Sequence, residues 1–186
     1  MKTWAAFLKD VRPSAPGIPE PRLEHAVLRA AQDFCDRTRA WKVELDPTTT
    51  RAGAVEYDLE LERNVELVRI ESATLNGIPF AVWRDGDLPR SRYVYTPDSK
   101  TLMFGEPMEA GARLVLTCTV KPGNAAAGID DALFDRYVTL IALKAVSIAT
   151  GDMTKRLDYE SQCDALKTRL WRGNAAIRPR TRPNFF

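Results

Sequence analysis

The sequence predicts an α+β protein: a small antiparallel helical bundle with an inserted antiparallel β-sandwich or barrel domain and an extended C-terminal arm. Apolar residues recur at the three- and four-residue spacing of helices before residue 41 and after residue 128. Between these limits the period changes to two, and turn-forming residues separate short segments, as in antiparallel strands. The predicted parts are residues 1–41 (N-terminal helices of the bundle), 42–121 (inserted β-domain), 129–173 (helical hairpin) and 174–186 (basic arm).

The N-terminal part is expected to hold a short helix at residues 3–9, stopped by a proline series that begins at Pro13. A long helix is expected after Pro21, over residues 22–40, with one apolar stripe that must cover another apolar surface. Only the two helices late in the chain can supply that surface, so the β segment is interpreted as an insertion whose ends lie close together. The stripe consists of Leu23, Ala26, Val27, Ala30, Ala31, Phe34 and Cys35.

Seven short strands are expected in the middle of the chain, which is typical of a small antiparallel sandwich or barrel. The sharpest turn signal is Asn76-Gly77, because both central residues of a type I′ hairpin turn need a positive φ. Strict alternation along the longest strand assigns Leu67 to one face and Ile70 to the other. The predicted strands are residues 42–45, 55–59, 66–75, 79–84, 92–96, 101–104 and 113–120.

A helical hairpin is expected after the loop at residues 123–128. Either Asp130 or Asp131 is placed to cap a helix that runs to Thr150, and Gly151 is placed to end it in the left-handed conformation. Asp152 or Thr154 then caps a last helix over residues 154–172, and the short turn makes the two helices antiparallel. The apolar side of the last helix carries Tyr159, Cys163, Leu166 and Leu170.

Charge is distributed unevenly along the chain. The whole sequence has 27 Lys plus Arg against 25 Asp plus Glu, a net charge of +2, yet no acidic residue follows Asp164. Residues 1–166 therefore form a weakly acidic body with a net charge of −4, so the mild overall basicity says little about affinity for nucleic acid. The basic residues that follow Asp164 are Lys167, Arg169, Arg172, Arg178, Arg180 and Arg182.

Composition excludes several classes of protein. The 186 residues are 45% hydrophobic, which is enough for one domain with a core and argues against disorder. No apolar run approaches the roughly 20 residues that span a bilayer, and the N-terminus does not have the pattern of a signal peptide. We therefore expect a protein made in the cytoplasm, with no membrane contact. Cys35, Cys118 and Cys163 are odd in number and far apart, which predicts reduced core thiols.

The C-terminal arm cannot continue the last helix, because Pro179 and Pro183 lack the amide donor and favour extended geometry before them. Phe185 and Phe186 then stand at the tip of a basic arm that has too little apolar surface to fold alone. Either it docks on a partner or it is a disordered, solubilising tail. Two terminal aromatic rings favour docking, with the arginines of the arm on carboxylates and the rings in an apolar pocket.

Catalysis finds little support in the sequence. His25 lies opposite the apolar stripe of its helix and is expected to be a solvated surface histidine. The glycines at 123 and 128 are not followed by the Lys-Ser or Lys-Thr of a phosphate-binding loop, and Glu60 with Glu62 fits an outward strand face. We therefore expect no enzyme, no cofactor and no metal site, although an enzyme of unrecognised type stays a third hypothesis.

Several local features occur in a characteristic order along the chain. The first long helix ends in Arg-Ala-Trp at residues 39–41, and a strand with the sequence Ala-Val-Glu-Tyr-Asp-Leu follows at 54–59. Arg-Tyr-Val-Tyr occupies 92–95, and Phe-Asp-Arg-Tyr-Val at 134–138 leads to Ala142 and Lys144. In this layout, from about Leu23 onwards, the chain resembles the head-to-tail adaptors of tailed bacteriophages, also called tail tubular protein A-like or head completion proteins.

This resemblance implies a ring, commonly of twelve copies, that joins the portal of a filled capsid to the tail (nozzle or hub) protein and continues the DNA channel, with transient contact to the genome. The protein would then lie in the virion neck, and the arm would reach along the portal. The predicted portal-binding residues are Arg178, Arg180, Arg182, Phe185 and Phe186. The predicted subunit-interface or channel residues are Lys155, Arg156, Lys167, Arg169 and Arg172.

The alternative function is a nucleic-acid-binding module that uses the basic arm and a β-face. Lys155 with Arg156, and Lys167 with Arg169, are candidates for phosphate contacts. Charged positions on the outer face of a helix explain these residues equally well.

Overall fold

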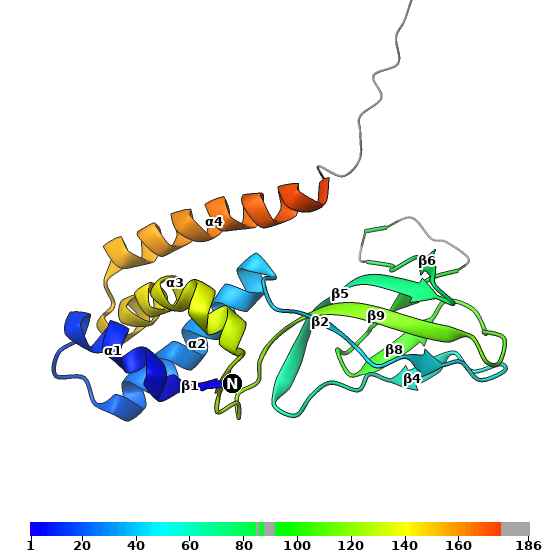
Figure 1. The fold of residues 1–186 in the computed structure, drawn as a ribbon, viewed down its shortest axis with the longest axis horizontal. Helices are drawn as coiled ribbons and strands as arrows, with labels where there is room; N and C mark the ends of the chain where they lie inside the picture. The colour runs from blue at the N-terminus through cyan, green and yellow to red at the C-terminus, as the bar shows by residue number, and fades with distance from the viewer. Residues whose placement is uncertain (85, 88–91, 176–186) are drawn as a thin grey trace, which may run out of the picture.

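A computed structural model describes residues 1–84, 86–87 and 92–175 of the chain, with side chains described as far as residue 170. The molecule is elongated, with helices at one end and strands at the other (Figure 1). The helical segments are η1 (Trp4–Phe7), α1 (Leu8–Val11), η2 (Arg12–Ser14), α2 (Glu20–Thr38), α3 (Asp131–Thr150) and α4 (Met153–Ala175). The strands are β1 (Lys2–Thr3), β2 (Lys42–Glu44), β3 (Thr48–Thr49), β4 (Glu56–Asp58), β5 (Val65–Leu75), β6 (Ile78–Phe80), β7 (Val94–Tyr95), β8 (Thr101–Phe104), β9 (Arg113–Pro122) and β10 (Gly128–Ile129).

The long helix α2 begins earlier than predicted, at Glu20, with Pro21 inside its first turn. A proline is tolerated there because the first amides of a helix have no partner within the helix. The helix ends at Thr38, where Arg39 adopts a left-handed φ of 54° and donates its amide to the Cys35 carbonyl. The predicted range of 22–40 is therefore displaced by two residues at each end.

The helical hairpin follows the predicted capping. Asp130 accepts hydrogen bonds from the amides of Ala132 and Leu133 and begins α3. Gly151 ends α3 at a φ of 76°, and Asp152 accepts from the amides at the start of α4. The last helix runs to Ala175, so the first two residues of the predicted arm are helical, which corrects that boundary.

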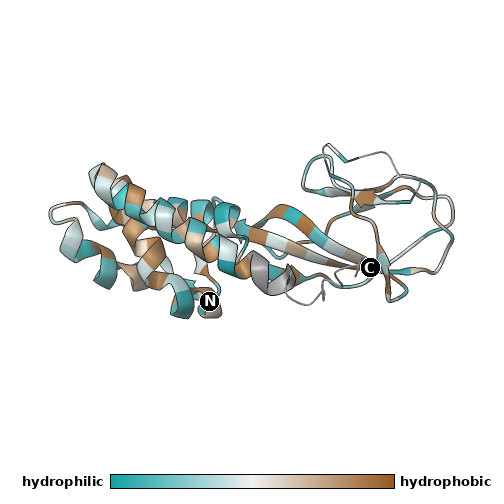
Figure 2. Ribbon diagram, turned by 90° about the horizontal axis from the view of Figure 1, so that it is seen from above, coloured by the Kyte–Doolittle hydropathy of each residue, from teal (hydrophilic) through white to brown (hydrophobic). Residues whose placement is uncertain are grey.

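The apolar stripes of α2, α3 and α4 form one core together with the N-terminal turns. Phe7 stands edge-on to Phe134 with 4.8 Å between the ring centres, and the Trp4 indole donates to the carbonyl of Ala126. The stripe predicted for α2 and the side predicted for α4 both lie in this cluster, as expected. Figure 2 shows these helices packed side by side at one end of the molecule.

A two-stranded pairing that was not predicted fixes the N-terminus. The strand β1 pairs with β10, with Lys2 opposite Ile129 and Thr3 opposite Gly128. A Cβ atom at Gly128 would overlap the carbonyl of Lys2, so the residue must be glycine for the two backbones to come this close. No apolar alternation marks strands of two residues, which explains why periodicity missed them.

The strands form antiparallel sheets, and none of them closes into a barrel among the described residues, so the barrel alternative is wrong. One sheet has the order β2-β9-β5-β6, with β3 also paired to β9, and the other has the order β4-β8-β7. Asn76 and Gly77 have φ values of 51° and 78° and connect β5 to β6, as predicted. The strands predicted at 79–84 and 92–96 are shorter than expected, and β3 was missed.

Strict alternation along β5 is interrupted by two register shifts against β9, between Leu67 and Arg69 and between Ile70 and Ser72. Each shift is a bulge, which adds one residue and turns the following side chains over. Leu67, Ile70 and Ala73 are consequently all buried, opposite Val120, Cys118 and Leu116 of the regular partner strand. The assignment of Leu67 and Ile70 to opposite faces is therefore wrong, because bulges change parity.

A second apolar cluster lies in the β part and takes residues from both sheets. Tyr57, Leu102 and Phe104 come from the three-stranded sheet, whereas Ile70 and Leu116 come from the larger one. Figure 2 shows apolar and polar residues alternating in bands along the long strands. The partly buried Trp41 packs against both clusters and stands where the two parts meet.

The ends of the β segment lie side by side, as predicted. Val120 donates its amide to the carbonyl of Trp41, and β2 pairs with β9 over residues 42–44. Gln32 donates to the carbonyl of Pro122, and Lys121 forms an ion pair of 3.0 Å with Asp36. The contacts of Gln32 and Asp36 attach β9 to α2.

The three cysteines are buried and unpaired, as predicted. Burial raises the pKa of the Cys118 thiol to about 12 and also raises the pKa of the Cys35 thiol. None of the helices in the described ranges is both long and apolar enough to cross a membrane.

Candidate docking sites

The helix α4 carries the basic end of the chain, so its attachment decides how that end is presented. Tyr159, Cys163 and Leu166 are buried against α2 and α3, and Leu170 packs on the edge of the same core. Figure 1 shows α4 lying lengthwise over the other helices. Apolar contacts are not directional, so they alone would allow α4 to tilt on α2 and α3. Polar contacts along one side of α4 restrict its orientation.

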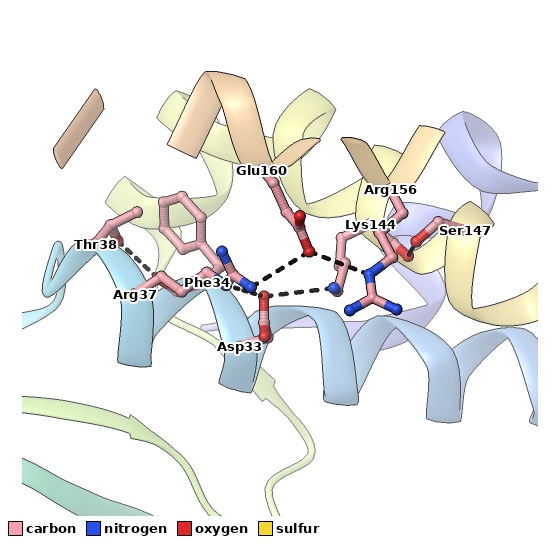
Figure 3. A network of polar contacts seen from close by, with 8 residues as sticks. All are labelled: Asp33, Phe34, Arg37, Thr38, Lys144, Ser147, Arg156 and Glu160. Carbon is pink, nitrogen blue, oxygen red and sulfur yellow. Dashed lines mark hydrogen bonds and ion pairs between the residues drawn. The ribbon is translucent and has the colours of Figure 1, made fainter. Parts of the chain in front are cut away.

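A network of five charged side chains joins α4 to the other two long helices (Figure 3). The Asp33 carboxylate on α2 lies 3.3 Å from Arg37 Nε and 3.7 Å from Lys144 Nζ on α3. On α4, Glu160 lies 3.4 Å from Arg37 and 3.1 Å from Arg156. Three cations therefore share two carboxylates.

Lys144 is the most buried member of this network, with 11% of its side chain exposed. Its ammonium group also lies 5.0 Å from the centre of the Tyr159 ring, within the range of a cation–π contact. Burial raises the pKa of the Tyr159 hydroxyl, and neighbouring Cys163 and Asp33 raise it further. That hydroxyl forms no hydrogen bond of good geometry with a described residue. Tyr159 is therefore a neutral, packed ring beneath the cation.

The network is suited to holding helices and not to catalysis. Its carboxylates are paired with cations, and the pKa of Glu160 is lowered by the hydrogen bond from Arg156 and by the nearby charges of Arg156, Arg37 and Lys144. A carboxylate held in its charged form at neutral pH is a poor general acid. We conclude that the five side chains position α4.

The predicted interface or channel residues on α4 do not form one basic stripe. At about 100° of rotation per residue, Lys155 and Arg169 lie on one flank of the buried side, and Arg156 and Lys167 lie on the other. Arg156 is exposed but engaged with Glu160. The outward side carries Met153 and Leu157, each 60% exposed. The four members of the predicted set whose side chains are described thus fall into two pairs.

Arg169 lines a shallow groove of about 420 Å³ between α3 and α4. Arg136 of α3 contributes a second guanidinium, and the apolar floor includes Leu140 and Leu166. A predicted interface residue and a second arginine therefore line the same groove. The remaining lining residues are Tyr137, Thr139, Gln162 and Ala165.

The predicted portal-binding residues Arg178, Arg180, Arg182, Phe185 and Phe186 lie outside the described residues. The side chain of Arg172 is outside them as well, although its backbone belongs to α4. The docking role assigned to these positions therefore stays a prediction.

The β part contains a larger cleft, of about 680 Å³, which we call the β-part cleft. One wall is formed by β2, β3 and the loop between them, and the other by β4 and the residues that follow it. Partly buried apolar side chains that also pack on the β cluster line its floor: Trp41, Val43, Leu45, Leu61 and Val65.

The rim of the β-part cleft is acidic. Its five carboxylates face a single guanidinium, that of Arg51, which lies 5.4 Å from the centre of the Tyr57 ring. All five carboxylate residues are exposed, and none forms an ion pair with a residue that the structure describes. These residues are Glu44, Asp46, Asp58, Glu60 and Glu62.

Sequence reasoning missed this cleft, although it placed Glu60 and Glu62 on an outward face. Both are exposed, as expected, with half-buried Leu61 between them. The net charge of −4 over residues 1–166 indicated an excess of acidic residues, but composition does not tell where on the surface these residues gather. Residues 44–46 come near residues 58–62 only because the two sheets pack on each other, since β2 belongs to one sheet and β4 to the other.

The lone histidine of the chain lies at the surface. His25 is exposed, as predicted, on the outer side of α2. Within residues 1–84, 86–87 and 92–175, no group of three or more His, Cys, Asp or Glu side chains is placed to hold a metal ion.

No family model and no curated protein matches this chain.

Proposed function

We propose that this chain is a structural virion protein, a ring-forming adaptor that joins the portal of a bacteriophage capsid to the tail and continues the DNA channel. Its partners are then the portal protein, a tail nozzle or hub protein and further copies of itself, in a ring of about twelve by the resemblance to such adaptors. In this proposal the helices form a bundle that builds the ring, and the β part is a sandwich-like insertion.

The observation that carries the proposal is the anchoring of α4. Its apolar side and its charged network attach it to α2 and α3, and the sequence after Ala175 has three arginines, two phenylalanines and no acidic residue. Because α4 is attached in this way, the basic segment that follows it begins at a defined place and in a defined direction. A tail that only increases solubility would not need such an attachment.

Repetition in a ring supports docking by so short a segment. Ordering about a dozen residues costs on the order of 10–20 kcal/mol of backbone entropy, which limits the affinity of one segment alone. Once one copy is bound, the neighbouring copies bind almost intramolecularly, and avidity rises. A weakly acidic body also suits a DNA channel, since tight phosphate binding there would hinder passage of the genome.

The test is to mix the chain with a purified portal ring and measure the mass of the complex, for the full chain and for a chain that ends at Ala175. We expect the full chain to form a complex of portal plus about twelve copies, and the shortened chain to fail. Assembly by both forms would remove the role of the segment, and assembly by neither would overturn the adaptor function.

Two matched variants separate charge from apolar contact. Arg178→Gln, Arg180→Gln and Arg182→Gln together remove three charges but keep both rings, whereas Phe185→Ser with Phe186→Ser does the reverse. We expect both to weaken portal binding. Arg178→Lys, Arg180→Lys and Arg182→Lys together keep the charge and serve as the control.

A nucleic-acid-binding module is the second candidate, and the groove that holds both Arg136 and Arg169 is the observation in its favour. Under this alternative the isolated chain binds duplex DNA with an affinity that falls steeply as salt rises. Arg136→Gln with Arg169→Gln would then reduce both the affinity and the salt slope.

A further inference from the structure

The sequence of this chain contains a segment whose charge and apolar residues complement the acidic rim and apolar floor of the β-part cleft. Residues 176–186 carry three arginines and two phenylalanines, whereas the cleft combines an apolar floor with five carboxylates that have no ion pair among the described residues. We propose that the β-part cleft binds residues 176–186 of a second copy of this chain, as a strand added to the edge of β4.

The free edge of β4 is the first support. Among the described strands, in the order β4-β8-β7, β4 has a neighbour on one side only. The hydrogen bonds to β8 use odd-numbered residues of this segment: Val55 accepts from Phe104, and Leu59 donates to Lys100. Since successive residues of a strand point their backbone groups to opposite edges, those of Asp58 and Glu60 point to the free edge. An extended partner finds unused donors and acceptors there.

The spacing of charge is the second support. Asp58, Glu60 and Glu62, which we call the acidic row, are exposed and alternate with buried Leu59 and half-buried Leu61. The row therefore lies on one face of an extended segment, with a spacing of two residues. It ends at Glu62, whose carbonyl already accepts from the amide of Val65.

The C-terminal segment has the same spacing with the opposite sign. Arg178, Arg180 and Arg182, which we call the arginine row, alternate with Pro179, Thr181 and Pro183. In an extended conformation the arginine row shares one face and one hydrogen-bonding edge. Placed beside β4, its side chains stand opposite the acidic row, and such cross-strand pairs of opposite charge are stabilising.

The prolines give the added strand one usable edge. Pro179 and Pro183 have no amide hydrogen, and both fall on the edge opposite to that of the arginine row. Proline is accepted in a strand only where its edge has no partner. The segment can thus pair with β4 on one side while its other side is blocked against further strands.

A second copy is a better source of the segment than the same chain. The C-terminal end of α4 and the strand β4 lie on opposite sides of β5 and β9 (Figure 1). A segment that leaves α4 there would have to pass round the sheet before reaching its own cleft. A neighbouring copy meets no such obstacle, and a head-to-tail contact of this kind repeats from copy to copy.

This inference needs only the chain itself and does not depend on the proposed function. The same segment cannot occupy a portal and a cleft at once. In the absence of a portal, residues 176–186 of one copy therefore bind the cleft of another copy. Binding of the segment to a portal would leave that cleft empty.

The test measures self-association of the full chain by sedimentation velocity over a wide range of concentration. We expect association that weakens as salt rises and that is reversed by an excess of a synthetic peptide of residues 176–186. Removal of those residues should abolish it. A full chain that stays monomeric at every concentration, including one that keeps its own segment in its own cleft, would overturn the proposal.

Variants of the cleft make the test specific. Asp58→Asn, Glu60→Gln and Glu62→Gln together alter exposed side chains only, so the fold is retained, and we expect association about tenfold weaker. Asp10→Asn, Glu109→Gln and Asp135→Asn together make the same change of charge at exposed positions outside both the cleft and β4, and serve as the control. Equal weakening by both triple variants would show a general effect of charge and would refute the cleft.

Discussion

The ammonium group of Lys144 on α3 lies over the ring of Tyr159 on α4, 5.0 Å from its centre, and 3.7 Å from the carboxylate of Asp33 on α2. One buried cation therefore contacts all three long helices. Burial of a charge is costly unless partners compensate for it, so this arrangement makes the packing of α4 sensitive to each partner.

We predict that Lys144→Met, which keeps an unbranched side chain and removes the charge, lowers the free energy of unfolding by about 1–3 kcal/mol. The cause is the Asp33 carboxylate, whose Oδ2 is buried and would lose its contact with α3. Urea denaturation followed by circular dichroism measures the loss. Lys100→Met, at an exposed lysine, is the control and should cost little.

The combination of Lys144→Met with Asp33→Asn extends this prediction. Both charges of the pair are then absent, so we expect the double variant to lose less stability than the sum of the two single changes. Additive losses would mean that the 3.7 Å contact has no energetic weight.

The bulges of β5 predict an order of stability effects that strict alternation does not. Leu67→Ala and Ile70→Ala should each cost about 2–4 kcal/mol, since both side chains are buried, whereas Val68→Ala should cost clearly less because Val68 is only half-buried. Thermal unfolding of the three variants decides the matter. A regular strand would group Val68 with Ile70 and make Leu67 the exception, and that pattern would contradict the bulges.

Periodicity predicted most of the fold because most of it is periodic. The stripe from Leu23 to Cys35 and the caps at Asp130 and Gly151 are local signals, and the structure has them where they were expected. The bulges of β5 are not visible locally, because their evidence is the regular burial of Leu114, Leu116, Cys118 and Val120 on the opposite strand. The face to which a residue of β5 points depends on its register with β9, so the sequence of β5 alone predicts the wrong face after a bulge.

The pairing of the N-terminus with the loop before α3 predicts a specific demand for glycine. Gly128→Ala should detach β1, because the new Cβ would overlap the Lys2 carbonyl, and should cost about 1–3 kcal/mol. Amide hydrogen exchange would show loss of protection at the N-terminus. Gly111→Ala meets no neighbouring atom and bears only the strain of a positive φ, so it should leave exchange at residues 2–3 unchanged.

Prediction of the candidate sites from sequence was limited by distance along the chain. The charge of Glu60 and the basic residues of α4 were recognised, but the wall that carries Glu44 lies about sixteen residues away along the chain and belongs to the other sheet. The division of Lys155 and Arg156 between two flanks of α4 likewise follows from the core that α4 meets. Sites assembled by tertiary contacts need those contacts to be known.

Glu160 on α4 predicts how stability depends on pH. Its pKa is lowered from the ordinary value of 4.5, first by the hydrogen bond from Arg156 and also by the charges of Arg156, Arg37 and Lys144. A carboxylate whose pKa is lower in the folded chain binds fewer protons there than in the unfolded chain, so it stabilises the fold above pH 4.5. That contribution is lost as the pH falls through the lower, folded pKa.

Glu160→Gln should therefore reduce stability at neutral pH, and the difference from the unaltered chain should shrink as the pH falls below 4.5. Urea midpoints measured from neutral to acid pH give this difference directly. Glu109→Gln, at an exposed carboxylate with no ion pair to a described residue, should show no comparable convergence. A constant difference between Glu160→Gln and the unaltered chain at all pH values would mean that packing of the side chain, and not its charge, attaches α4 at this point.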